Sequence, residues 1–363
     1  MIPFNQLKPL HELLAQEIAL AMRRVADSGW YILGPEVEAF EREFADYHNV
    51  GHALGVASGT DAIELALRAG GIGPGDEVIT VAHTAMATVT AIEAAGAKPV
   101  LADIDLSTYT LDPKSALDRV TDRTRAIVVV HLYGQPADLA SLDAIARERD
   151  LLLIEDCAQA HGATWNRAKV GTVGHMGTFS FYPTKNMGAY GDGGAVITRD
   201  AALADNLRKL RNYGQTTRYT HQSRGCNSRL DELQAAILRV KLRHLDRHNQ
   251  RRQAIAANYD ALLTGVVRPC VPANAEHVYH LYVIRDRRRD QLMAALKARD
   301  IGTLIHYPVP IHLQESHRDL GMAAGSLPNT EKAAREILSL PLFIGLSDDE
   351  VERVCLTIRE LRG

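Results

Sequence analysis

Short apolar runs bounded by turn residues recur between residues 50 and 200, and longer segments with helical spacing separate them. The runs are ALGVA (53–57), EVITVA (77–82), PVLAD (99–103), AIVVVHL (126–132), LLLIED (151–156), GTFSFY (177–182) and GAVIT (194–198). Most are apolar at every position rather than at alternate positions, which is typical of strands covered on both faces. The pattern predicts a large α/β domain in which a mostly parallel seven-stranded sheet lies between layers of helices.

Segments between and after these runs carry apolar residues at helical spacing. DAIELALRAG (61–70) and DLASLDAIARERD (138–150) predict helices that alternate with the strands. Residues 229–263 continue such a stripe over a longer stretch and predict one long amphipathic helix or two in series. A helix of this length can bridge two domains.

The last part of the chain has a different pattern. YHLYVIR (279–285) predicts a strand, RDQLMAALKARD (289–300) a helix, and SDDEVERVCLTIRELR (347–362) a closing helix with Ser347 as its N-cap. We therefore expect a large α/β domain over residues 1–245 and a smaller C-terminal α+β domain over residues 246–363.

Composition and charge narrow the class of protein. The 363 residues include 41 Lys and Arg and 44 Asp and Glu, which leave a formal charge of −3. A nucleic-acid-binding domain usually has a clear basic excess, so no nucleic-acid partner is expected. No segment is apolar over the ~18 residues of a membrane span, and the amino terminus lacks the pattern of a signal peptide. We expect no membrane partner.

The cysteines indicate the compartment. Cys157, Cys226, Cys270 and Cys355 lie far apart, and no C-x-x-C pair suggests a zinc or dithiol site. Reduced thiols fit a cytoplasmic protein, and we expect no bound metal.

A lysine and an aspartate stand out as candidates for chemistry. Lys185 lies in GTFSFYPTKNMGAYGDGGA (177–195), between an aromatic strand and a glycine-rich turn. Asp156 ends a predicted buried strand, at the edge where α/β sheets place their ligands. A buried carboxylate needs a cationic partner. The alternatives are a surface lysine in a loop and an aspartate that caps the following segment.

Pyridoxal 5'-phosphate is a cofactor whose requirements these residues match. It needs a lysine amine for its Schiff base, a carboxylate beside its pyridine nitrogen and donors for its phosphate. Lys185 and Asp156 supply the first two. Ser58, Gly59 and Thr60 follow a strand and open a helix, where backbone N–H groups can hold a phosphate. Small residues at this position also simply cap helices.

Five ordered motifs then resemble one family. They are SGTDAIELALRAGGIGPGDEVIT (58–80), VVVHLYGQPAD (128–138), EDCAQAHGA (155–163), FSFYPTKNMGAYGDGGA (179–195) and NSRLDELQAAIL (227–238). The chain resembles the DegT/DnrJ/EryC1/StrS aminotransferases of fold type I, which act mainly on nucleotide-linked keto-sugars. The resemblance runs from the amino terminus to the last helix.

The resemblance implies roles for the residues of the cofactor site. Lys185 would bond the cofactor and shuttle protons, Asp156 would face the pyridine nitrogen, and Gln159 would face the phenolic oxygen. Because a branch of the family that deoxygenates sugars has histidine in place of the lysine, Lys185 favours transamination, with L-glutamate as the expected amino donor.

Other residues would bind the phosphate group of the cofactor. The resemblance implies that Ser180 and the backbone of Gly59 and Thr60 hold the phosphate. It also implies a homodimer with shared active sites, in which Asn227 reaches the phosphate from the second subunit.

One segment departs from the family pattern. Relatives often carry an aromatic residue in a stretch like H-T-[FYW], where this chain has His83, Thr84, Ala85 and Met86. We predict that His83 stacks on the cofactor ring, with Met86 as the alternative.

Similarity in the C-terminal part points to a substrate. YHLYVIR, IHYPVPIHLQ (305–314) and His161 look most like members that aminate C-3 of dTDP-3-keto-6-deoxyhexoses, which would place His306 and Tyr307 near the cofactor and sugar. Arg229 would meet a donor carboxylate or substrate phosphate, or else form a structural salt bridge. The alternatives are C-4 amination of a dTDP-, UDP- or GDP-4-keto-6-deoxyhexose, a cyclitol substrate, and a non-catalytic regulatory protein that binds the cofactor.

Overall fold

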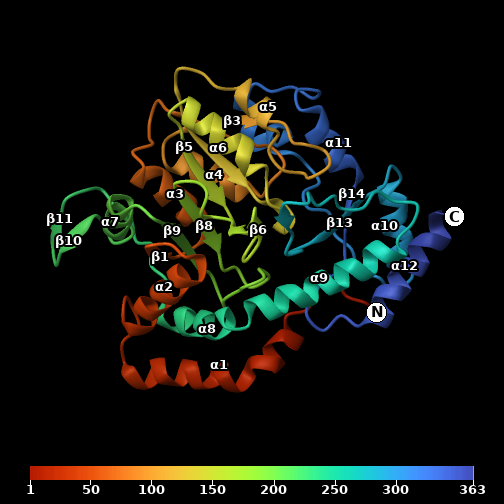
Figure 1. The fold of residues 1–363 in the computed structure, drawn as a ribbon, viewed down its shortest axis with the longest axis horizontal. Coiled ribbons are helices and arrows are strands. Elements are labelled where there is room, and N and C mark those ends of the chain that lie inside the picture. The colour runs from red at the N-terminus through yellow and green to blue at the C-terminus, as the bar shows by residue number, and fades with distance from the viewer. Residues whose placement is uncertain (363) are drawn as a thin grey trace.

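A seven-stranded sheet forms the centre of the computed structural model, which describes residues 1–362 (Figure 1). Its strands are β1 (His52–Val56), β2 (Glu77–Val81), β3 (Lys98–Ala102), β4 (Thr124–Val130), β5 (Leu152–Asp156), β8 (Met176–Ser180) and β9 (Gly194–Thr198). They follow the order β1-β9-β8-β5-β4-β2-β3, and all neighbours are parallel except the two pairs that include β9. The predicted mostly parallel seven-stranded sheet is confirmed.

Helices cover both faces of this sheet. Because side chains alternate along a strand, Ala126 and Val128 of β4 enter one apolar core, while Ile127 and Val129 enter the other. The first core packs against α3 (Gly59–Ala69), α4 (Met86–Ala94) and α7 (Ala201–Leu210). The second packs against α2 (Pro35–His48), α6 (Leu139–Glu148) and α8 (Glu232–Leu242). The sheet is the middle of three layers.

The long amphipathic stretch forms two helices in series, α8 and α9 (Leu245–Leu262). Figure 1 shows them running below the sheet toward the C-terminal part. The helix α1 (Lys8–Ser28) packs Leu14, Ile18 and Val25 against α8. Its opposite face stays exposed, with Leu13 and Leu20 each 63% accessible.

The C-terminal part is built around two antiparallel strands, β13 (Tyr282–Arg285) and β14 (Ile337–Leu340). The helices α10 (Arg289–Lys297), α11 (Pro328–Glu336) and α12 (Asp348–Arg362) complete it. Ser347 accepts a hydrogen bond from the Glu350 N–H at 3.2 Å, which confirms the predicted N-cap. The strand expected from residue 279 begins at Tyr282.

Short elements connect these parts. They are α5 (Pro113–Leu117), β6 (Thr164–Trp165), β7 (Ala168–Lys169), β10 (Gln215–Thr217), β11 (Thr220–His221), β12 (Ala275–Glu276) and the 3₁₀ helices Leu132–Gly134, Ile311–Leu313 and Glu315–Leu320. The β10–β11 hairpin extends away from the body of the molecule (Figure 1). No helix within residues 1–362 is both long and apolar enough to cross a membrane.

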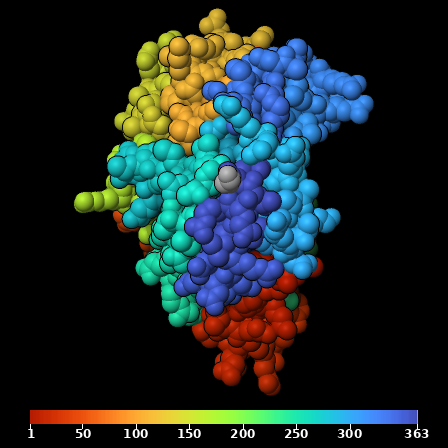
Figure 2. Space-filling view, turned by 90° about the vertical axis from the view of Figure 1, so that its right-hand side faces the viewer, coloured from red at the N-terminus to blue at the C-terminus, as the bar shows by residue number. Residues whose placement is uncertain are grey.

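The first residues of the chain pair with the C-terminal part. The Ile2 N–H donates to the Asp300 carbonyl at 2.7 Å, and the Gly302 N–H donates to the Ile2 carbonyl at 2.8 Å. Figure 2 shows the N-terminal segment at the lower end of the molecule, below α12. The division into domains at residue 245 stays a prediction, and the first residues pack with the C-terminal part.

Candidate active site

A cavity of about 240 Å³ opens at the carboxyl edge of the sheet. It is lined by Ser58, Gly59, Thr60, Ile63, Thr84, Ala85, Ala87, Thr88, Val130, Asp156, Ala158, Gln159, Ser180, Tyr182, Lys185 and Asp192. Because parallel strands end at the same edge, the segments that follow β1, β2, β5 and β8 converge here. The fold therefore brings together Lys185, Asp156 and the Ser58–Thr60 turn.

Asp156 is the last residue of β5 and is 5% exposed. One carboxylate oxygen accepts from the Thr88 hydroxyl at 2.9 Å, and the other accepts from the Ala158 N–H at 3.1 Å. Burial raises the pKa of Asp156, against the opposing effects of these two hydrogen bonds and the nearby Lys185 charge. These bonds orient the carboxylate.

Burial and the charge of the partner also shift the pKa of Lys185, each in the direction opposite to its effect on Asp156. Burial lowers the pKa of Lys185 to about 8, and the negative charge of Asp156 limits this decrease. An ordinary lysine has a pKa of about 10.4, so this amine has far more free base at neutral pH. The free base is the form that attacks a carbonyl or accepts a proton.

A tight turn holds Lys185 in place. Its N–H donates to the Tyr182 carbonyl at 2.9 Å. Gly188 closes the turn, and a Cβ atom there would lie 2.3 Å from the Pro183 carbonyl oxygen, so only glycine fits. The Asn186 amide donates to Asn249 of α9 at 2.9 Å. The lysine backbone is thus tied to a helix outside the sheet.

The Ser58–Thr60 turn has the geometry of an anion site. Ser58 caps α3 by accepting from the Asp61 N–H at 3.1 Å. The backbone N–H groups of Gly59 and Thr60, which line the cavity, belong to the first turn of the helix and are available to an anion. A Cβ atom at Gly59 would lie 2.5 Å from Cβ of Ser180, so glycine lets the helix approach β8. The residues present fit the phosphate of the predicted cofactor.

Gln159 is held on both sides of its amide group. The Tyr133 N–H donates to its oxygen at 2.7 Å, and its nitrogen donates to the Tyr307 hydroxyl at 3.1 Å. The structure therefore brings Tyr307 to a cavity residue. His306 does not line the cavity; its Nδ1 lies 2.9 Å from the Ser339 hydroxyl, and its ring stacks on Phe4 with ring centres 5.5 Å apart.

Two other predicted histidines lie behind the cavity wall. The ring of His161 is 5.5 Å from that of Phe179, and burial lowers the pKa of His161 to about 3. His83 Nε2 lies 2.8 Å from the Tyr133 hydroxyl, and burial lowers the pKa of His83 to about 4. Both side chains are neutral. Their roles toward sugar and cofactor stay predictions.

Asn227 and Arg229 do not line the cavity of their own chain. Asn227 is exposed. Arg229 donates to the Asn212 side chain at 3.1 Å, and its guanidinium lies 5.7 Å from the centre of the Tyr213 ring. Contacts of either residue with a second subunit or a substrate stay predictions.

Three residues near the site were not singled out from the sequence. Thr88 orients Asp156, Tyr133 orients Gln159, and Ser228 donates to Asp61 in the first turn of α3 at 2.6 Å. Tyr133 lies within the motif VVVHLYGQPAD. No local spacing signals its partner, because these hydrogen bonds join residues far apart in sequence.

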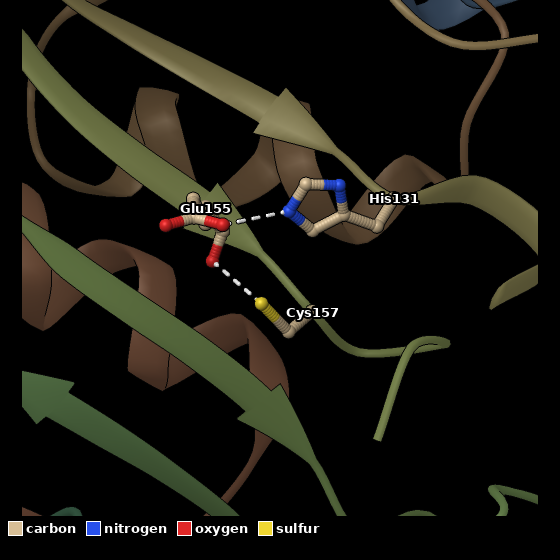
Figure 3. Close-up of side chains that lie close together, drawn as sticks. All are labelled: His131, Glu155 and Cys157. Carbon is tan, nitrogen blue, oxygen red and sulfur yellow. Dashed lines mark hydrogen bonds and ion pairs between the residues drawn. The ribbon is translucent and has the colours of Figure 1, made fainter. Parts of the chain in front are cut away.

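A buried cluster lies beside the site (Figure 3). Ligand atoms of His131, Glu155 and Cys157 lie within 4.8 Å of one another, a composition that could suit a metal. The Glu155 carboxylate, however, accepts from His131 at 2.9 Å and from the N–H groups of Gly171, Val173 and Gly174 at 2.7–2.8 Å. Four donors use the lone-pair directions of a carboxylate. We interpret the cluster as a structural contact that holds residues 171–174 and His131 to β5.

The fold and site define an α/β protein in which a partly buried lysine, a buried carboxylate and the anion-binding Ser58–Thr60 turn line one small cavity. The model of the DegT/DnrJ/EryC1/StrS aminotransferase family matches residues 12–359. The chain belongs to this family, which confirms the resemblance seen in its motifs.

Characterised relatives match along almost the whole chain. A dTDP-3-amino-3,4,6-trideoxy-α-D-glucose transaminase of Streptomyces venezuelae is 48% identical to this chain. The match covers 99% of this chain and 96% of the relative. A dTDP-3-amino-3,6-dideoxy-α-D-galactopyranose transaminase of Aneurinibacillus thermoaerophilus is 48% identical, with 98% of each chain covered.

A solved structure gives the same result. The crystal structure of S. venezuelae DesV in complex with a ketimine intermediate has a TM-score of 0.97 and 48% identity, over 99% of this chain and 98% of that chain. The fold and the family of this chain are established by these matches.

Proposed function

We propose that the chain is a pyridoxal 5'-phosphate-dependent aminotransferase that transfers an amino group from L-glutamate to C-3 of a dTDP-3-keto-6-deoxyhexose. The observation that carries this proposal is the partly buried Lys185 in the same cavity as the buried Asp156, beside the Ser58–Thr60 turn. The names of the two transaminases above support the nucleotide, the sugar class and the ring position.

Each group of the site has a place in this reaction. When bound, the cofactor supplies an electron sink that stabilises negative charge at the carbon bearing the amino group. Asp156 would hold a proton on its ring nitrogen, and the Ser58–Thr60 turn with Ser180 would bind its phosphate. The Lys185 amine would accept the proton from that carbon and return it during the reaction. Its lowered pKa suits this role, because both protonation states are populated near pH 8.

A homodimer is part of the proposal. Within residues 1–362, Lys185 is the one cationic side chain that lines the cavity, whereas a nucleoside diphosphate needs positive partners. Large aromatic side chains also lie exposed: Trp30 at 60%, Tyr31 at 51% and Tyr219 at 80%. Exposed aromatic side chains are enriched at sites of protein interaction. A second subunit would cover them and bring Asn227 to the phosphate.

Other parts of the proposal follow from composition. A near-neutral charge gives no basis for a nucleic-acid or membrane partner. The cysteines are free in the described structure, which supports a cytoplasmic location.

The direct test is visible absorption of the cofactor-loaded protein. Excess L-glutamate should bleach the band of the bound cofactor, and one sugar from a panel of dTDP- and UDP-linked 3-keto and 4-keto sugars should restore it. Restoration by 3-keto sugars alone supports the proposal. Restoration by 4-keto sugars would move amination to C-4, and a band that responds to no amino acid would favour the regulatory alternative.

Replacement of Lys185 tests the observation on which the proposal depends. Lys185→Ala should abolish turnover, because the variant lacks the amine that binds the cofactor covalently and moves the proton. Lys209→Ala is the control: this lysine pairs with Asp205 on the surface of α7, and its loss should leave turnover unchanged. Full activity of Lys185→Ala would contradict the proposal.

A further inference from the structure

Tyr133 joins three segments that lie far apart in the sequence. Its hydroxyl is 2.8 Å from Nε2 of His83, which follows β2, and it donates to the backbone carbonyl of His306 in the C-terminal part. Its backbone N–H donates to Gln159 after β5 at 2.7 Å. The residue is 2% exposed, so water does not compete for these bonds.

The direction of each bond follows from the chemistry of the groups. A carbonyl oxygen only accepts, so the Tyr133 hydroxyl uses its proton on His306. The hydroxyl oxygen therefore accepts from His83, which must carry its proton on Nε2. Burial lowers the pKa of His83 to about 4 and raises the pKa of Tyr133 well above its ordinary value. The arrangement persists across the physiological pH range.

Two of the three hydrogen bonds of Tyr133 lead to the pair His306 and Tyr307. The hydroxyl holds the His306 carbonyl directly, and the N–H fixes the Gln159 amide, whose nitrogen donates to the Tyr307 hydroxyl at 3.1 Å. Tyr133 thus anchors the His306–Tyr307 segment against a wall of the cavity. Within residues 1–362, its hydrogen bonds include neither Lys185 nor Asp156.

We propose that Tyr133 is a positioning residue for the acceptor sugar, which it serves by holding the His306–Tyr307 segment in place through its hydroxyl group. This inference rests on the proposed function, which supplies separate donor and acceptor half-reactions, and on the predicted place of His306 and Tyr307 near the sugar. It assigns Tyr133 to the acceptor half-reaction.

The two half-reactions separate this role from a general structural one. Tyr133→Phe keeps the ring and removes the hydroxyl, so the Gln159 bond from the backbone remains. In stopped-flow absorbance, the half-reaction with L-glutamate should stay within about twofold of wild type. The half-reaction with the dTDP-3-keto sugar should lose about 10- to 100-fold in kcat/KM, mainly through KM, as expected for one lost buried hydrogen bond.

A neighbouring tyrosine gives a matched control. Tyr109 is buried, and its ring centre lies 5.7 Å from that of Tyr133, but its hydroxyl makes no bond to His306 in the described structure. Tyr109→Phe should leave both half-reactions within about twofold of wild type. Equal losses in both half-reactions of Tyr133→Phe, or no loss in either, would overturn the inference.

A second variant tests the inference if Tyr133→Phe does not fold. Ser339→Ala removes the other polar anchor of His306, a 2.9 Å contact with its ring, and should give the same acceptor-selective loss. Unchanged acceptor kinetics in Ser339→Ala would then overturn the inference. A wild-type protein that responds to neither glutamate nor sugar would overturn the proposed function and the inference with it.

Discussion

At the scale of single residues, burial is the main influence on the chemistry of the site. It raises the pKa of Asp156 and lowers the pKa of Lys185, and thus favours the neutral form of each. Their mutual attraction and the hydrogen bonds to Asp156 work against this effect. The lysine keeps a reactive amine close to neutral pH, while Thr88 and Ala158 keep the carboxylate oriented.

The lowered lysine pKa can be measured in the protein without cofactor. Competitive labelling with acetic anhydride, read by mass spectrometry, should show Lys185 gaining reactivity with a midpoint near pH 8. In Asp156→Asn this midpoint should fall, because the negative charge that favours the protonated amine is gone. A midpoint near the ordinary value of about 10.4 in both proteins would show that burial has no such effect.

At the scale of elements, Glu155 ties the centre of the sheet to the segment before β8. Its neighbour Asp156 belongs to the active site, while Glu155 points to the opposite face and binds His131 after β4. The Ala137 N–H donates to Nδ1 of His131 at 3.1 Å, so the ring donates from Nε2 to Glu155. Burial opposes ionisation of Glu155, but the bonds from His131 and the backbone outweigh it and lower its pKa.

Glu155→Gln should destabilise the protein. One side of the new amide would present N–H groups to the N–H donors that the carboxylate accepts from, so buried groups would lose partners. We expect a loss of about 3–5 kcal/mol in the free energy of unfolding, measured in urea. Glu148→Gln, at an exposed position on α6, should change it by less than about 1 kcal/mol.

The pH dependence gives a second check on the same cluster. Because the folded pKa of Glu155 is depressed, its contribution to stability is present above the unfolded pKa of about 4.3 and is lost as the pH falls toward the folded value. The difference in stability between wild type and Glu155→Gln should therefore shrink below about pH 4. A constant difference from pH 7 to pH 3 would mean that the pKa of Glu155 is the same in the folded and unfolded states.

At the scale of the whole molecule, the cavity of one chain lacks cations for a nucleotide, while aromatic residues lie exposed elsewhere. A symmetric dimer would resolve both features, because each subunit could complete the site of the other. The exposed position of Asn227 outside its own cavity fits this arrangement.

Mixing two inactive variants tests the shared site. Lys185→Ala and Asn227→Ala should each have little activity alone, because the first lacks the amine and the second lacks a phosphate ligand from the partner. After unfolding and refolding together, a hybrid dimer has one site with both native residues, so activity should return to about a quarter of wild type. No recovery, with hybrid dimers shown by mass spectrometry, would place Asn227 and Lys185 in sites of the same chain or outside the site.

Local patterns in the amino-acid sequence were enough to predict the strands, the strand-end position of Asp156, the glycine-rich turn around Lys185 and the family. These features rest on local patterns: apolar runs for buried strands, and small residues where a helix or turn begins. The strand order, the break between α8 and α9, and the partners of Tyr133 and Glu155 are visible only in the folded chain. The physical reason is that these contacts join residues with no fixed spacing along the chain. Folding alone brings Tyr133 to His306 and Thr88 to Asp156.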